Sequence, residues 1–214
     1  DFTHAGAAAG HAALAARSGR PLVLGTSGLS AEDEAAVAAA AERVPIVYAA
    51  NFAPGVNLVL AIAERMAAAL PGEQYDAEIL EMHHRQKVDA PSGTALALGR
   101  AVARGRGTTL EAAGAESGRD GHCGARRTGS IGFAALRGGD IVGDHTVLFA
   151  GSGERIEITH RSTSRANYAQ GSLRAARLRA TKCRAPPAAL PRVRRSTSCC
   201  VAGRRLPARP RAPG

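Results

Sequence analysis

Four basic side chains crowd together just before a predicted helix start, and their chemistry suits them to hold a small dianion. His83, His84, Arg85 and Lys87 lie within five consecutive positions. Histidine is the one side chain that donates a proton near neutral pH without an unusual environment. A solvated basic loop ahead of an ordinary helix would carry the same charges. The cluster by itself therefore leaves both interpretations open.

The residues after this cluster predict a helix whose first turn faces it. Ser92 is a suitable N-cap, and residues 93–98 that follow it are good helix formers apart from the glycine at the start. The backbone N–H groups of Gly93 and Thr94 would have no partner within the helix and would point back toward the basic side chains. A carboxylate could be held there, which favours the binding interpretation.

Residues 81–95 read E-M-H-H-R-Q-K-V-D-A-P-S-G-T-A. This stretch resembles, almost residue for residue, the signature of the dihydrodipicolinate reductase family, E-x-H-H-R-x-K-x-D-A-P-S-G-T-A. The resemblance implies that His83 is the proton donor and Lys87 a second catalytic group. It also implies that His84, Gly93 and Thr94 bind the carboxylates of the substrate. The reaction implied is reduction of a cyclic imine dicarboxylate by NADPH or NADH, in the diaminopimelate route to lysine.

Upstream of the signature, the pattern predicts a parallel, doubly wound α/β arrangement. An Ala-rich helix at residues 4–18 precedes an apolar strand at 21–24, and a capped helix from Ser30 to about Arg43 precedes a second strand at 45–50. Ligands bind at the carboxyl ends of strands in such sheets. By resemblance, the nicotinamide end of the cofactor is assigned to Gly25, Thr26, Ser27, Ala49, Ala50, Asn51 and Phe52.

Further along the chain the residue pattern changes, and it predicts a separate α+β domain. A helix at residues 55–70 precedes a strand at 75–82 that delivers the signature. After a polar, Gly-rich stretch at 105–129, strands at 130–136, 140–150 and 154–161 are expected to form an antiparallel meander. Several segments here also resemble the family's second domain, so that the likeness covers about residues 1–178.

The expected fold class is therefore α/β, with the second half only of a Rossmann-type parallel sheet and a mixed α+β domain for substrate binding and tetramerisation. The expected divisions are residues 1–52 for the dinucleotide domain, 53–161 for the substrate domain, 162–182 for a helix that returns to the first domain, and 183–214 for a basic tail. The resemblance implies a homotetramer that forms through the sheet of the second domain.

Two departures from the family pattern lead to an alternative function. The G-x-G-x-x-G turn that opens a dinucleotide-binding domain is not found, so we expect the sequence to start near the middle of that domain. The Pro- and Arg-rich tail after Cys183 has no hydrophobic periodicity, and we expect it to be disordered. The alternative is a non-catalytic fragment that retains only the dicarboxylate-binding domain.

Charge and composition argue against other classes of protein. The net charge is +10, but from Gly171 onward there are twelve Lys or Arg residues and no acidic residue, which leaves the rest of the chain at −2. A specific nucleic-acid partner is not expected, because the basic tail has no interleaved aromatic residues. The histidines lack zinc-ligand spacing, so no metal site is expected. No apolar run is long enough to predict a membrane span, and a cytoplasmic protein is expected.

Overall fold

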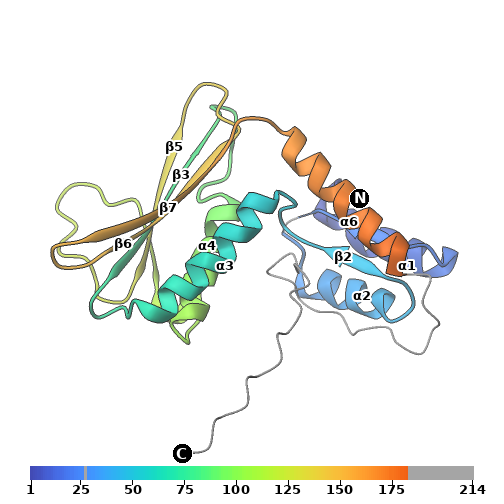
Figure 1. Cartoon of the computed structure of the whole chain (residues 1–214), viewed down its shortest axis with the longest axis horizontal. Coiled ribbons are helices and arrows are strands. Elements are labelled where there is room, and N and C mark those ends of the chain that lie inside the picture. Colours follow the sequence, from blue (N-terminus) through green and yellow to red (C-terminus); the bar gives the residue numbers. More distant parts are fainter. Residues whose placement is uncertain (27, 183–214) are drawn as a thin grey trace, which may run out of the picture.

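The structure, a computed structural model, describes residues 1–26 and 28–182, and two sheets organise this part of the chain (Figure 1). In the N-terminal unit, β1 (Leu22–Leu24) and β2 (Ile46–Tyr48) pair in parallel. A short 3-10 helix (Ala5–Ala7), α1 (Ala8–Ser18) and α2 (Ala31–Ala41) complete the unit. The predicted βαβ arrangement is thus confirmed, although the second strand is shorter than residues 45–50.

Small apolar residues build the core of the N-terminal unit. The side chains that α1, α2 and the strands bury against one another are Ala8, Ala12, Ala15, Ala16, Leu24, Val37, Ala40 and Val44. The N-terminus of α2 has the predicted cap: Ser30 Oγ accepts a hydrogen bond from the Asp33 backbone N–H at 3.1 Å, and the Asp33 carboxylate accepts one from the Ser30 backbone N–H at 3.2 Å.

The C-terminal unit contains a mixed five-stranded sheet with the order β4-β5-β3-β6-β7. Its strands are β3 (Asp76–His83), β4 (Ala115–Ser117), β5 (Ile131–Arg137), β6 (Gly143–Ala150) and β7 (Arg155–Ser162). The predicted antiparallel meander is wrong for its first strand. β5 pairs in parallel with β3, and β3 separates it from β6, so that only β6 and β7 form a hairpin.

In this order β3 is the central strand of the sheet. It has a neighbour on each side along almost its whole length, with Ile79 opposite Phe133 on β5 and opposite Val147 on β6. Turn residues between consecutive strands indicated a hairpin between β5 and β6, but burial of the β3 side chains decided the pairing. The stretch at 105–129 also contains α5 (Leu110–Ala113) and β4, neither of which was predicted.

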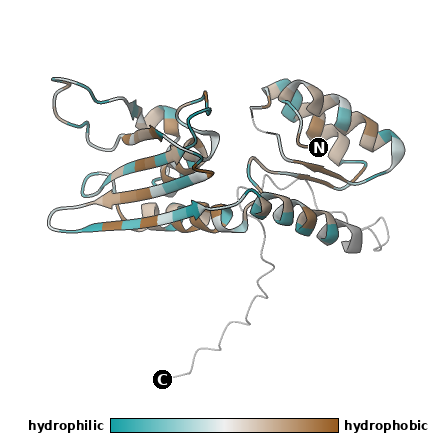
Figure 2. Cartoon of the chain, turned by 90° about the horizontal axis from the view of Figure 1, so that it is seen from above, coloured by the Kyte–Doolittle hydropathy of each residue, from teal (hydrophilic) through white to brown (hydrophobic). Residues whose placement is uncertain are grey.

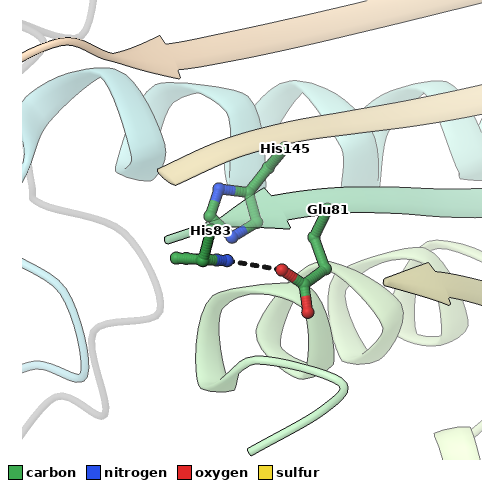
Figure 3. Close-up of side chains that lie close together, drawn as sticks. All are labelled: Glu81, His83 and His145. Atoms are coloured by element: carbon green, nitrogen blue, oxygen red, sulfur yellow. Dashed lines mark hydrogen bonds and ion pairs between the residues drawn. The ribbon is translucent and has the colours of Figure 1, made fainter. Parts of the chain in front are cut away.

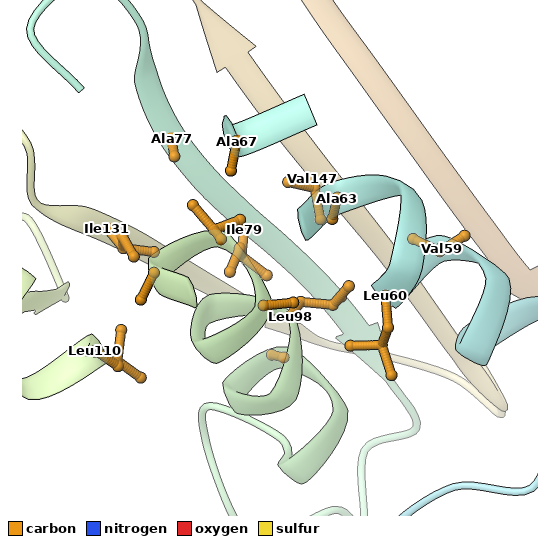
Figure 4. Packing of buried hydrophobic residues seen from close by; sticks show 14 of the residues in the cluster. Val59, Leu60, Ala63, Ala67, Ala77, Ile79, Leu98, Leu110, Ile131 and Val147 are labelled. Atoms are coloured by element: carbon orange, nitrogen blue, oxygen red, sulfur yellow. The ribbon is translucent and has the colours of Figure 1, made fainter. Parts of the chain in front are cut away.

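Two helices cover one face of this sheet and form the main core (Figure 4). They are α3 (Pro54–Ala69) and α4 (Gly93–Gly105), which pack against each other. α4 contacts β3, β5 and β6, and α3 contacts β7. The helices approach closely at Gly105, where an added Cβ would lie 2.2 Å from the Glu64 carbonyl oxygen. Phe149 and Ile79 are fully buried under them.

Among the described residues, no helix lies against the opposite face of the sheet (Figure 1), and hydrophilic and hydrophobic residues alternate along the strands (Figure 2). Leu80 and Leu136 lie on this uncovered face and are 37% and 51% exposed. Met82 and Leu148 share the face by strand alternation. None of the helices in the part of the chain described here is both long and apolar enough to cross a membrane.

The last helix of the described chain, α6 (Ala166–Lys182), runs from the end of β7 back to the N-terminal unit (Figure 1), where it contacts β1. At Gly171 the helix backbone comes close to this unit, since an added Cβ would lie 1.8 Å from the carbonyl oxygen of Phe52. A glycine at this position lets the helix backbone rest directly on the segment that follows β2. The basic tail lies outside the described residues.

Candidate active site

The carboxyl end of β3 places two ionisable side chains on the face of the sheet that α4 covers. Glu81 and His83 are two residues apart, so strand alternation points both of them toward the helices. Their side chains point at each other, and His83 Nδ1 contacts Glu81 Oε2 (Figure 3). Glu81 is 1% exposed and His83 is 9% exposed, so the pair is almost completely removed from water.

Arg137 compensates the buried charge of Glu81. It stands at the end of β5, in register with His83, and donates from Nη1 to Glu81 Oε2 at 2.9 Å and from Nη2 to Oε1 at 2.8 Å. The Ser92 backbone N–H also donates to Oε1, at 3.2 Å. Burial acts to raise the pKa of Glu81, but the hydrogen bonds from Arg137 and His83 together lower it below its usual value.

A second buried histidine lies against His83. The His145 ring of β6 meets the His83 ring edge-on, with 5.0 Å between the ring centroids. Burial lowers the pKa of His145 to about 4, and the positive field of His83 acts in the same direction. Burial also lowers the pKa of His83 itself, while its hydrogen bond to Glu81 opposes that shift. Both imidazoles are therefore neutral at neutral pH.

The start of α4 closes over this group as the sequence predicted. Ser92 has an extended backbone, and its Oγ accepts a hydrogen bond from the Ala95 backbone N–H at 3.2 Å, which confirms the N-cap. The same hydroxyl lies 3.2 Å from His145 Nε2. Because the Ser92 backbone N–H binds Glu81, one residue links the helix start to both sides of the buried cluster. Gly93 and Thr94 form the first turn that follows.

The loop between β3 and α4 holds Lys87 near this cluster. Its Nζ donates to the Asp89 carboxylate at 2.7 Å, and the Asp89 carbonyl oxygen accepts from Arg137 at 2.7 Å. The positive charge of Lys87 also acts on the pKa of His83, in the lowering direction. The structure thus brings the two predicted catalytic residues into one electrostatic environment.

His84 faces a different neighbour from His83. Its Nε2 lies 3.5 Å from Nη2 of Arg165, a residue of the segment between β7 and α6. These two residues border an open cavity of about 470 Å³, together with Gln86, Asp140 and Val142. The cavity adjoins the signature loop and is lined by one carboxylate, Asp140, and by two cationic or potentially cationic side chains, so an anionic group can be held beside His84 and Arg165.

The residues assigned to the cofactor stand at the ends of β1 and β2. Gly25 packs against the Phe2 ring, and Phe2 in turn meets Phe52 edge-on at 5.5 Å between centroids. Thr26 is 4% exposed, and its hydroxyl has no hydrogen-bond partner within the described chain. Ala49 and Ala50 follow β2. Ser27 lies outside the described residues.

One hydrogen bond joins a predicted cofactor residue to a predicted substrate residue. The side-chain amide of Asn51 donates to the Thr94 hydroxyl at 3.2 Å. The amide oxygen of Asn51 accepts from the Ala53 backbone N–H at 2.8 Å, which fixes the side chain at the entry to α3. The segment after β2 therefore touches the first turn of α4, so that the two sets of residues meet at one place.

Glu81, His83 and His145 also form a group whose ligand-type atoms all lie within 4.8 Å of one another. Spacing along the chain did not indicate this group, because His145 comes from another strand. Its fit to a metal ion is poor. Both oxygens of Glu81 already accept hydrogen bonds from Arg137, and a guanidinium at that distance repels a second cation.

Several residues of the site were not assigned from the sequence. Glu81 belongs to the signature, and its spacing of two from His83 on a strand places both side chains on one face. Arg137 and His145 join the site only through strand pairing, and Arg165 only through the turn into α6. The contact of His145 with His83 is likewise not indicated by spacing along the chain.

Comparison with known proteins gives consistent matches across the two units. Residues 1–52 match the family model described as "Dihydrodipicolinate reductase, N-terminus", and residues 55–187 match "Dihydrodipicolinate reductase, C-terminus". Among curated relatives, the 4-hydroxy-tetrahydrodipicolinate reductase of Granulibacter bethesdensis is 61% identical over 176 residues, which are 82% of this chain and 67% of that protein. The enzyme of the same name from Acidiphilium cryptum is 60% identical over 82% of this chain and 71% of its own length.

A solved structure supports the same relationship. The dipicolinate-bound dihydrodipicolinate reductase from Paenisporosarcina sp. TG-14 superimposes with a TM-score of 0.63 at 28% sequence identity. The match covers 83% of this chain and 66% of that one. The chain therefore spans about two thirds of the length of the relatives it matches.

Proposed function

This chain belongs to the dihydrodipicolinate reductase family, and from that premise we propose that it reduces 4-hydroxy-tetrahydrodipicolinate to tetrahydrodipicolinate with NADPH or NADH. The reaction belongs to the diaminopimelate route to lysine, which makes the cytoplasm the expected location. The observation that supports this function best is the buried Glu81–His83 pair at the end of β3, beside the N-terminus of α4.

The residues present are compatible with a nicotinamide at the ends of β1 and β2. A buried Thr26 hydroxyl that lacks a partner among the described residues can bond a carboxamide, and the segment from Ala49 to Phe52 offers backbone groups next to it. When bound, the reduced nicotinamide supplies a hydride to the conjugated ring of the substrate. Titration with each dinucleotide measures the preference between NADPH and NADH.

Substrate binding is proposed to rest on charge and on the first turn of α4. Lys87 and His84 provide positive or potentially positive side chains, while the backbone N–H groups of Gly93 and Thr94 are donors at the positive end of a helix dipole. A cyclic dicarboxylate carries two negative charges, so groups on both sides of it are needed. The open cavity bordered by His84 and Arg165 supports this assignment.

His83 is proposed to supply the proton that completes the reduction. Loss of water from the 4-hydroxy substrate gives the conjugated ring that accepts the hydride, and protonated His83 transfers its proton to the electron-rich product of hydride addition. In total, one hydride and one proton are added and one water leaves. The lowered pKa makes the protonated imidazole a stronger acid than an exposed histidine. Lys87 holds a substrate carboxylate and keeps the region positive while negative charge develops.

Steady-state kinetics of single variants tests these roles. His83→Gln and Lys87→Ala should each lower kcat by about 10² to 10⁴, the range expected for a positioned proton donor or charge. His84→Ala and Thr94→Val should act mainly on KM, because those contacts exist before and during the reaction. His122→Gln, in an exposed loop, is the matched control. Values of kcat for both His83→Gln and Lys87→Ala within about threefold of the parent would remove them from the chemistry.

Calorimetric titration with pyridine-2,6-dicarboxylate, NADPH and NADH tests binding without turnover. We propose that residues 1–52 bind the cofactor, that residues 53–161 bind the substrate, and that residues 162–182 return to the first unit. The assignments to cofactor and substrate are supported if Thr94→Val lowers the affinity for the dicarboxylate and leaves the affinity for the dinucleotides unchanged. Equal losses of both affinities would contradict that division.

We also propose that the uncovered face of the five-stranded sheet forms a homotetramer interface. Leu80, Met82, Leu136 and Leu148 make an apolar surface on a face that no helix of the described chain covers. Exposed apolar patches of this kind usually mark association surfaces. Light scattering should give four chains per particle, and Leu80→Lys should reduce that number. Leu14→Lys, on an exposed leucine of α1, should leave it unchanged.

A further inference from the structure

We infer that Glu81, anchored by Arg137, is a positioning residue that fixes the orientation of His83 and selects the ring nitrogen that exchanges the proton. This inference rests on the role proposed for His83 above. Glu81 is the most deeply buried acidic side chain among the described residues, at 1% exposure. Its two oxygens accept hydrogen bonds from His83, from both terminal nitrogens of Arg137 and from the Ser92 backbone.

The hydrogen-bond directions define the tautomer of His83. An ionised carboxylate can only accept hydrogen bonds, and both oxygens of Glu81 accept from Arg137, which keeps the carboxylate ionised. His83 Nδ1 must therefore be the donor in its contact with Glu81 (Figure 3). The proton at Nδ1 is committed to this bond, so Nε2 is the nitrogen that takes up and releases a proton.

The surroundings of Nε2 are consistent with this assignment. The nitrogen lies over Gly143, where an added Cβ would be 3.0 Å away. The absence of a side chain at residue 143 leaves Nε2 uncrowded on that side. The Nδ1 side is closed by Glu81, and the ring is held edge-on against His145. The imidazole has one defined orientation with one nitrogen available.

Arg137 has a separate task within this arrangement. Without a cation, a buried carboxylate next to an imidazolium could take the proton itself and leave a neutral pair. The bidentate guanidinium stabilises the ionised carboxylate, so that the proton stays on His83. The same guanidinium donates to the Asp89 carbonyl oxygen, and Asp89 pairs with Lys87. One side chain thus organises both proposed catalytic residues.

Four ionisable groups surround His83, and their effects on its pKa have known signs. Glu81 on β3 raises it, whereas Arg137 on β5 and Lys87 in the loop lower it. His145 on β6 is neutral near pH 7 because its own pKa is about 4. Removing Glu81 or Arg137 should therefore move the His83 pKa in opposite directions. General loss of packing would not produce opposite shifts.

The test is nitrogen NMR of histidine-labelled full-length protein, with steady-state kinetics alongside. In the parent, His83 should show a protonated Nδ1. In Glu81→Gln its pKa should fall, the tautomers should mix, and kcat should drop by about tenfold or more with KM changed less than about threefold. The descending limb of the kcat profile should move to lower pH. In Arg137→Gln the His83 pKa should rise while Nδ1 stays protonated.

Glu78→Gln is the matched control. It removes a carboxylate from the same strand, but Glu78 lies on the uncovered face and pairs with Arg126 and Arg119. The His83 NMR signals and the steady-state kinetics of the Glu78→Gln variant should equal those of the parent. If Glu81→Gln does not fold, the rise in the His83 pKa predicted for Arg137→Gln tests the inference. An unchanged tautomer and pKa of His83 in the folded variants overturn the inference. NMR answers even where turnover is absent, so failure of the proposed function would be seen separately.

Discussion

Replacing His145 by glutamine should flatten the dependence of stability on pH between about pH 7 and pH 5. His145 is 3% exposed and stays neutral in the folded protein, since burial lowers its pKa to about 4 from an ordinary value of 6.5. In the unfolded chain the same imidazole takes up a proton as the pH falls below its ordinary value. Protons therefore favour the unfolded state, and stability is lost as the pH falls from 6.5 toward 4.

The size of this effect follows from the two pKa values. The full difference of the two corresponds to roughly 3 kcal/mol, of which about 2 kcal/mol is lost between pH 7 and pH 5. Above pH 7 the contribution is constant, because neither state then binds the proton. Glutamine keeps a polar group near the Ser92 hydroxyl but does not titrate. The variant should therefore lose about 2 kcal/mol less than the parent over this interval.

Urea unfolding at a series of pH values measures the free energy directly. His122→Gln is the control, because it also removes one histidine but from an exposed loop, and its pH dependence should match that of the parent. If His145→Gln and the parent lose the same stability between about pH 7 and pH 5, within about 0.5 kcal/mol, then His145 is not held neutral by burial and the reasoning fails.

Three further substitutions, with Gly10→Ala as a control, test packing and capping. Phe149→Ala should lower the free energy of unfolding by about 3–5 kcal/mol, because the ring is fully buried in the main core; a loss below about 1 kcal/mol in urea unfolding would contradict this. Ser30→Ala should cost about 1 kcal/mol through loss of the α2 cap, seen as a lower melting temperature of the N-terminal unit. Gly105→Ala should lower the free energy of unfolding by about 1–3 kcal/mol, because its Cβ would meet the Glu64 carbonyl oxygen. Gly10→Ala, with open space around it, should instead stabilise α1. Equal effects of the two substitutions would argue against close packing of α3 and α4.

Local signals in the sequence predicted the helices and strands well. Ser30 and Ser92 both act as N-caps, and the helix predicted at residues 55–70 is α3, which begins at Pro54. These features depend on residues within one turn of each other, so the sequence carries them directly. The order of strands in the second sheet was predicted less well. Turn residues between β5 and β6 suggested a hairpin, but pairing of both strands with β3 depends on burial across the sheet.

The candidate site shows the same division between local and distant information. The signature identified His83 and Lys87, which lie in one charged region of the structure. Glu81 could also have been found, from its spacing on the same strand. Arg137 could not, because it lies 56 residues from Glu81 and reaches it only through parallel pairing of β3 with β5. Its charge alone does not distinguish it from other arginines of the chain.

The path of α6 has a consequence for exchanging parts of this protein with its relatives. The chain leaves the N-terminal unit after Phe52 and returns through α6, whose backbone at Gly171 rests on Phe52. Departure and return thus meet at one point, where α3 also contacts β7. Residues 53–165 therefore form an insertion whose two ends lie next to each other. Exchanging this insertion between species needs only two adjacent junctions. A junction placed after β7 would instead remove from the first unit a helix that packs against it.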